Sequence, residues 1–130
     1  MPEMKGFDEI SAEDKERLTL TGINTENMEG RSGSFLLGND HVYHAGSAAE
    51  GIETLMIEQA LEKYEWLKDY FWNIVPADKD EYTKYVAERP QRGYVIIAHK
   101  GAKATFPLQS CMFLQGDTIQ CVHNIVIAEE

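Results

Sequence analysis

The hydrophobic pattern of the sequence changes at a single segment, residues 89–93, which contains Pro90 and Gly93. Before it, apolar residues recur every three or four positions, as on one face of a helix. After it, β-branched and aromatic residues dominate, as in strands. Proline and glycine both interrupt regular structure. We therefore predict an α+β chain with a mainly helical region and a short hairpin over residues 1–92, followed by a strand-rich region over residues 93–130.

Three helices are expected before this boundary. The first covers residues 11–20, because Ser11 can cap its first turn and acidic residues follow. The second is a long helical stretch that ends before Pro76, and the third restarts it over residues 79–88. The apolar stripe of the second stretch consists of Ile57, Ala60, Leu61, Tyr64, Leu67, Phe71 and Ile74.

Several strands are also expected. Residues 35–37 and 41–44 flank a glycine-containing turn and predict a hairpin. After Gly93, the residue pattern predicts strands over 94–98, 111–114 and 118–128, separated by glycine-containing turns. This recurrence resembles the first rungs of a solenoid. Since the sequence stops directly after a strand, we expect a truncated chain with an exposed β-edge, through which it can self-associate.

Charge and hydropathy exclude several classes of function. The chain has 12 basic and 22 acidic residues, a net charge of −10, which repels nucleic acids and anionic lipids at long range. No apolar run approaches the roughly 20 residues that a membrane span requires. Residues 1–9 lack the basic-then-apolar pattern of a secretory signal. We therefore expect a cytoplasmic protein that binds neither nucleic acid nor membrane.

The candidate metal ligands are Cys111, Cys121 and His123, since thiolates and imidazoles bind zinc and iron–sulfur clusters. Cys121 and His123 share one face of the predicted strand. Two thiols alone do not make a site, however, and buried cysteine is also a common packing residue. The sequence has neither a phosphate-binding loop of the GxxxxGK[ST] type nor a GxSxG nucleophile motif, so we expect no enzymatic activity from this chain alone.

An aromatic cluster lies in the second helical stretch and cannot fit on one stripe. Within it, Trp66 and Tyr70 form an i, i+4 pair that can cover another part of the chain or a partner. The cluster consists of Tyr64, Trp66, Tyr70, Phe71 and Trp72.

Three segments resemble the SufB/SufD family of iron–sulfur cluster assembly proteins. Residues 93–109 combine an apolar strand, then Lys100-Gly101, then Pro-Leu-Gln at 107–109. Residues 123–130 are similar to the family's next strand. Residues 67–71, followed by Pro76, are similar to the helix before its core. The resemblance covers about residues 50–130, whereas residues 1–49 fit the family's variable N-terminal region without identifying it.

The resemblance implies a right-handed parallel β-helix, of which this chain contains only the first strands. It also implies an ABC-type ATPase subunit and a SufB/SufD paralogue as partners. The family's ATPase-binding helices and cluster-assembly residues lie mainly toward the C-terminus and do not map onto this chain. We therefore expect no catalytic residue, cofactor-binding residue or cofactor in this fragment, with any iron–sulfur cluster in the full-length complex.

Three functions remain open on this basis. The first is a non-catalytic N-terminal fragment of a cluster-assembly scaffold, from either a SufB-like or a SufD-like parent. The second is a small β-rich metal-binding protein or metalloenzyme that uses Cys111, Cys121 and His123. The third is an acidic protein-interaction module, favoured by the net charge of −10 and the surplus aromatic residues.

Overall fold

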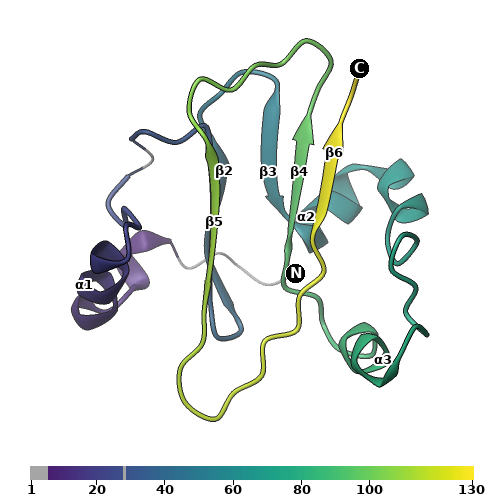
Figure 1. The fold of residues 1–130 in the computed structure, drawn as a ribbon, viewed down its shortest axis with the longest axis horizontal. Coiled ribbons are helices and arrows are strands. Elements are labelled where there is room, and N and C mark those ends of the chain that lie inside the picture. The colour runs from purple at the N-terminus through teal and green to yellow at the C-terminus, as the bar shows by residue number, and fades with distance from the viewer. Residues whose placement is uncertain (1–5, 28) are drawn as a thin grey trace.

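The computed structural model describes residues 6–27 and 29–130. Residues 1–5 of the N-terminal segment, for which no secretory signal was predicted, lie outside the described residues. Two small sheets stand at the centre, with helices on their outer sides (Figure 1). In chain order the elements are η1 (Phe7–Glu9), α1 (Ala12–Leu20), β1 (Gly33–Gly38), β2 (His41–Ser47), β3 (Ile52–Met56), α2 (Ile57–Lys63), η2 (Glu65–Asp69), α3 (Glu81–Ala87), β4 (Tyr94–Ala98), β5 (Leu108–Phe113) and β6 (Ile125–Ala128), where η marks a 3₁₀ helix.

The first sheet has the strand order β2-β1-β5. Strands β1 and β2 form the predicted antiparallel hairpin, whereas β1 and β5 are parallel. At the turn, Asn39 adopts a left-handed conformation with φ of 51°, which asparagine tolerates better than most residues. The Asn39 amide donates a hydrogen bond to the carbonyl oxygen of Phe113 (2.9 Å), which fixes the end of β5 beside the hairpin turn.

The second sheet has the order β3-β4-β6, with β3 antiparallel to β4 and β6 parallel to β4. From β4 the chain crosses to the first sheet as β5 and then returns as β6 beside β4 (Figure 1). Both sheets therefore combine strands from before and after Gly93. The division of the chain into two domains at residue 93 stays a prediction.

The prediction of a right-handed parallel β-helix is wrong, although the α+β class fits. A β-helix needs successive coils of parallel strands, and here two of the four strand pairs are antiparallel. The tight turn at Asn39 reverses the chain within the first sheet, and β3 enters the second sheet in the opposite direction to β4. The described residues thus form two small mixed sheets and no solenoid.

Three apolar clusters hold the layers together. One lies between the sheets and includes Phe35, Leu37 and Met56. A second lies between the second sheet and the α2–η2 segment, with Ile57, Ala60, Leu67, Val95 and Ile97 at its centre. A third lies between the first sheet and α1, around Ile10, Leu18 and Leu36. Each sheet is therefore apolar on both faces, which requires partners on both sides.

The helix predicted at 11–20 is confirmed, and the Ser11 hydroxyl accepts a hydrogen bond from the Asp14 amide at 3.1 Å, as an N-cap residue does. The long second stretch is not one helix. It stops at Lys63, because Tyr64 is extended (φ −121°), and it resumes as η2. As a result Leu67 is fully buried, whereas Ile74, placed on the same stripe, is 89% exposed.

Other strand predictions succeeded in part. Strand β4 coincides with the predicted 94–98, while the strand predicted over 118–128 is ordered as β6 only from Ile125. Strand β3 was not predicted. No helix among residues 6–27 and 29–130 is long and apolar enough to cross a membrane.

Candidate functional site

The Cys111 thiol lies on the α1 side of the first sheet. Its strand, β5, places it beside the apolar cluster of Ile10, Leu18 and Leu36. Burial raises the pKa of Cys111, because an apolar environment disfavours the thiolate. Since the thiolate is both the metal ligand and the nucleophile, this environment suits packing better than metal binding.

His123 lies on the other side of the molecule, in the segment that leads into β6. Its ring contacts Phe71 and Trp72, with centroid distances of 4.9 Å and 4.3 Å. Burial lowers the pKa of His123 and favours the neutral imidazole. Cys121 is buried two positions before it, at 7% exposure.

The structure does not bring the three predicted ligands together. Cys111 packs against the α1 cluster, whereas His123 packs against the segment after η2, and the two sheets lie between these regions (Figure 1). Within the described part of the chain, no three histidine, cysteine, aspartate or glutamate side chains are grouped as a metal site requires. The arrangement therefore supplies no convergent ligand set for the metalloenzyme hypothesis.

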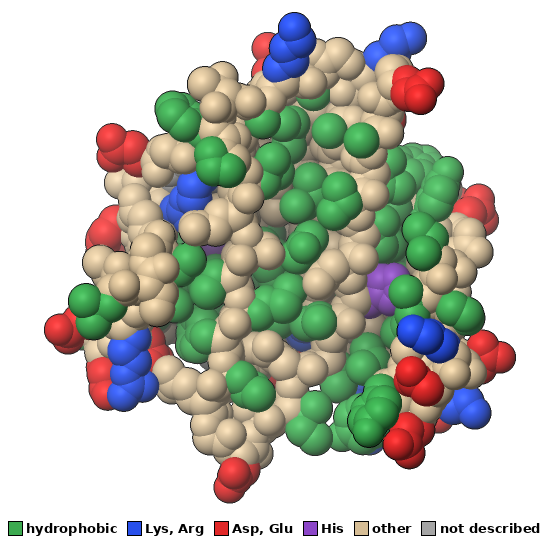
Figure 2. Space-filling model, viewed as in Figure 1, with side chains coloured by type: hydrophobic (Ala, Val, Ile, Leu, Met, Phe, Trp, Pro, Cys, Tyr) green, Lys and Arg blue, Asp and Glu red, His purple; other side chains and the backbone are tan. Residues whose placement is uncertain are grey.

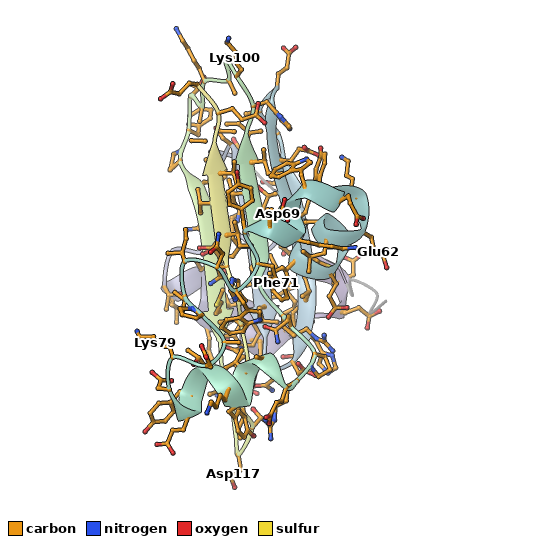
Figure 3. All side chains as sticks on the ribbon, turned by 90° about the vertical axis from the view of Figure 1, so that its right-hand side faces the viewer. Glu62, Asp69, Phe71, Lys79, Lys100 and Asp117 are labelled. Atoms are coloured by element: carbon orange, nitrogen blue, oxygen red, sulfur yellow. The ribbon has the colours of Figure 1, made fainter. Side chains whose placement is uncertain are left out.

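A concave, mostly apolar surface lies around His123, and we call it the aromatic groove. It encloses about 270 Å³. The segment that leads into β6 forms one wall of the groove, and α3 forms the other. The lining residues are Trp72, Val75, Tyr82, Thr83, Val86, Val122, His123 and Asn124. Figure 3 faces this side of the molecule, with Phe71 between η2 above and α3 below.

Trp72 is the most constrained residue of the aromatic groove. Its backbone has a positive φ of 55°, a conformation that is costly for a bulky side chain. This backbone directs the indole edge-on against His123, with an interplanar angle of 75°. Backbone strain of this kind concentrates at functional sites, which makes the groove a candidate for binding.

Exposed aromatic residues occur both in the groove and along the η2 segment. Tyr82, on α3, is 74% exposed although it lines the groove. The predicted Trp66–Tyr70 pair is confirmed as an edge-on contact with centroids 6.0 Å apart, and the two side chains are 38% and 47% exposed. Exposed aromatic residues of this kind are typical anchors of protein–protein interfaces.

A capping box fixes the start of α3. The Asp80 side chain accepts a hydrogen bond from the Thr83 amide at 2.8 Å, and the Thr83 hydroxyl completes a capping box. These interactions fix the start of α3, and with it the wall of the aromatic groove that carries Tyr82.

Comparisons with known proteins give the chain a family context. No protein-family model matches it. A protein of Archaeoglobus fulgidus named as an iron–sulfur cluster assembly SufBD family protein is 42% identical over 95% of this chain. A protein of Methanothermobacter thermautotrophicus with the same name is 41% identical over 94% of it. The chain is related to one segment of the SufBD family proteins.

The alignment with SufBD proteins extends beyond the resembling motifs, since it includes most of residues 1–49. This chain spans about a third of the length of the curated SufBD relatives it matches, 35% of one and 31% of the other.

This SufBD-related chain also has a polar cluster around Glu53 and His99, which the sequence analysis did not predict. His99 Nε2 lies 2.6 Å from a carboxylate oxygen of Glu53, and His99 Nδ1 lies 3.3 Å from one of Glu129. Lys63 and the Tyr64 hydroxyl also donate hydrogen bonds to Glu53. The His99 contacts join β3 to the residues that directly follow β4 and β6, across sequence separations of tens of residues. No local sequence pattern indicates such a cluster. The alternation of Glu53 with buried Ile52 and Thr54 is a strand signal, however, and it could have placed Glu53 on a strand.

The cluster shifts the pKa values of Glu53, Lys63, Tyr64 and His99. Burial acts to raise the pKa of Glu53, but hydrogen bonds from Lys63, Tyr64 and His99 outweigh it and lower the pKa to about 2. The hydrogen bond with Glu53 raises the pKa of His99 above its ordinary value. The two carboxylates of Glu53 and Glu129 therefore stabilise the protonated form of the His99 ring that lies between them.

This geometry predicts a pH dependence of stability. Because the pKa of His99 is raised in the folded state, its stabilising effect is complete below the unfolded value of about 6.5 and is lost as pH rises through the folded value. The gap in urea midpoint between wild type and His99→Gln should therefore be larger at about pH 6 than at about pH 8. Equal gaps at the two pH values would count against the ion pairs.

Proposed function

We propose that the chain works in iron–sulfur cluster assembly as a protein-binding scaffold component without turnover of its own. The single observation that carries this proposal is the 38–42% identity to SufBD family proteins over almost the whole chain. The aromatic groove supports a binding role, because it presents Tyr82 and Trp72 beside a half-buried histidine and no grouped metal ligands are found among the described residues.

The proposal includes specific partners. The chain would join an ABC-type ATPase subunit and a SufB/SufD paralogue, and the ATPase would bring its own nucleotide site, since this chain has no GxxxxGK[ST] loop. An iron–sulfur cluster would belong to the complete complex. The cytoplasm is the proposed location, which is consistent with the two unpaired cysteines.

The experiment that tests the non-catalytic part is anaerobic reconstitution. The purified chain is incubated with ferrous iron and sulfide, or with zinc, then desalted and assayed for bound metal. Cys111→Ser, Cys121→Ser and His123→Ala are assayed alongside His41→Ala, a control that removes an exposed imidazole outside the groove. We expect wild type and all variants to retain no metal above the buffer background.

Stoichiometric metal that is lost in the cysteine or His123 variants, and kept in His41→Ala, would refute the proposal. It would move the metal chemistry into this chain and support the metalloenzyme alternative. Metal lost equally in all variants would instead indicate loss of folding, and circular dichroism of each variant separates that case.

A further inference from the structure

A second concave surface lies at one end of the two sheets, away from the aromatic groove, and we call it the loop pocket. It encloses about 700 Å³, which is within the range of small-molecule sites. Its walls are the connection from β2 to β3 and the connection from β4 to β5 (Figure 1). The lining consists of residues 48–51, 100–103, 105 and 106, together with Ser32. None of these residues belongs to β6 or follows it.

Backbone hydrogen bonds hold the two walls of the loop pocket in place. The Ala48 amide donates a hydrogen bond to the carbonyl oxygen of Ser32 (2.9 Å). The His99 amide donates to the carbonyl oxygen of Gly51 (2.8 Å), and the Ser32 amide donates to that of Pro107 (3.0 Å). Each connection is therefore tied to the strands around it, and the pocket is formed before any ligand binds.

The Lys100-Gly101 pair of the sequence turns the chain at the rim of the loop pocket. Gly101 has a φ of 82°, a left-handed conformation that glycine adopts without strain. Across the pocket, Gly51 has a φ of 76°, and a Cβ atom there would lie only 3.0 Å from that of Ala102. The two glycines thus let the connections approach each other closely. Figure 3 shows Lys100 at the tip of this end of the molecule.

The lining of the loop pocket is net positive, although the whole chain has a net charge of −10. It carries Lys100 and Lys103 against one acidic residue, Glu50. Figure 2 shows basic side chains projecting from this end, with acidic ones nearby, but neither lysine forms an ion pair with a described residue. The neighbouring Glu129 carboxylate already contacts His99 and the Lys100 amide. Two unpaired ammonium groups beside a cavity favour an anionic ligand.

Ser32 and Phe106 add a buried donor and an apolar wall to the loop pocket. Ser32 is only 3% exposed, and its hydroxyl oxygen accepts a hydrogen bond from the Phe106 amide (3.1 Å). Its hydroxyl proton has no acceptor among the described residues, so it is free for a ligand. The Phe106 side chain is 53% exposed and lines the same pocket, where it can cover a flat apolar group.

We propose that the loop pocket binds the phosphate group of a small phosphorylated compound. The ammonium groups of Lys100 and Lys103 bind the phosphate oxygens, because charge-assisted hydrogen bonds are the strongest that this lining offers. The Ser32 hydroxyl donates a further hydrogen bond, and Phe106 covers the apolar part of the ligand. A phosphate group carries about two negative charges at neutral pH and so matches both lysines, whereas a carboxylate matches one. This binding is independent of the scaffold role and of the aromatic groove.

Calorimetric titration of the full chain with phenyl phosphate at low salt tests the proposal. We expect saturable binding at a single site, which Lys100→Gln and Lys103→Gln each weaken about tenfold, because each removes one ammonium group. Lys79→Gln is the matched control. Lys79 is also exposed and outside the described ion pairs, but it lies near α3, toward the other end of the molecule (Figure 3). This variant should bind phenyl phosphate as tightly as wild type.

Two further ligands separate the phosphate group from the apolar part. Inorganic phosphate lacks the ring and should bind about fivefold more weakly than phenyl phosphate. Benzoate keeps the ring with a single charge and should also bind more weakly. Amide chemical shifts in nuclear magnetic resonance spectra should move in residues 48–51 and 100–106 and stay fixed along α3. No binding of phenyl phosphate, equal losses in Lys79→Gln and the pocket variants, or equally tight binding of inorganic phosphate would overturn the proposal.

Discussion

Replacing Leu67 with alanine should lower the free energy of unfolding by about 2–5 kcal/mol, because it opens a cavity in the cluster between η2 and the second sheet. Leu67 is fully buried and packs with Val95 and Ile97. Chemical denaturation of both proteins measures the difference. The loss should appear as a lower urea midpoint with an unchanged slope.

The matched control is Leu20→Ala, which makes the same chemical change at a side chain that is 81% exposed on α1. It should change the stability by less than about 0.5 kcal/mol. If the two variants lose similar amounts, the α2–η2 segment does not cover the sheet as described, and the position of the aromatic groove would be in doubt.

Replacing Gly93 with alanine should destabilise the fold by about 1–3 kcal/mol or more, because a Cβ atom there has no space. It would lie 2.0 Å from the carbonyl oxygen of His123 and 2.7 Å from Oδ1 of Asn124. The chain leading into β6 would have to move, and the His123 ring would lose its contacts with Phe71 and Trp72. Thermal unfolding reports the first effect. Tryptophan fluorescence in a Trp66→Phe background, in which Trp72 is the remaining tryptophan, reports the second.

A double variant separates backbone from side-chain crowding at this position. Asn124→Ala removes the Oδ1 contact and the hydrogen bond that Oδ1 accepts from the Tyr94 amide, but it leaves the His123 carbonyl in place. Gly93→Ala should therefore remain destabilising in the Asn124→Ala background. Full recovery in the double variant would show that the crowding involves only the Asn124 side chain.

Elements with a local signal were predictable from the sequence. Ser11 and the acids after it specified α1, and the Gly38–Asp40 segment specified the hairpin, because caps and turns depend on neighbouring residues. The apolar run at 94–98 gave β4 at its observed bounds. Each of these signals lies within a few residues of the structure that it specifies.

Elements that depend on distant partners were not predictable in the same way. Strand β3 alternates buried Ile52, Thr54 and Met56 with half-buried Glu53 and Leu55, yet it was overlooked because it runs directly into α2. The β-helix was inferred from a family resemblance, whereas sheet order depends on contacts such as Val95 with Ile125, which no local pattern encodes.

The candidate site was anticipated only in part. His123 was singled out as a ligand beside Cys121, but its aromatic neighbours Phe71 and Trp72 come from a segment some fifty residues earlier. The alternation used to pair Cys121 with His123 assumed a strand over 118–128, and this part of the chain becomes a strand only at Ile125. The surplus aromatic residues were the better guide, since several of them line or flank the groove.

The most direct test of the account is a binding titration of the purified chain with a purified ABC-type ATPase and a full-length SufBD protein, such as that of Archaeoglobus fulgidus. The account predicts saturable binding that Tyr82→Ala weakens about tenfold or more, as expected for an aromatic anchor, and that Leu20→Ala leaves unchanged. Absence of binding, or binding that is indifferent to Tyr82→Ala, would contradict a scaffold component that works through its aromatic groove.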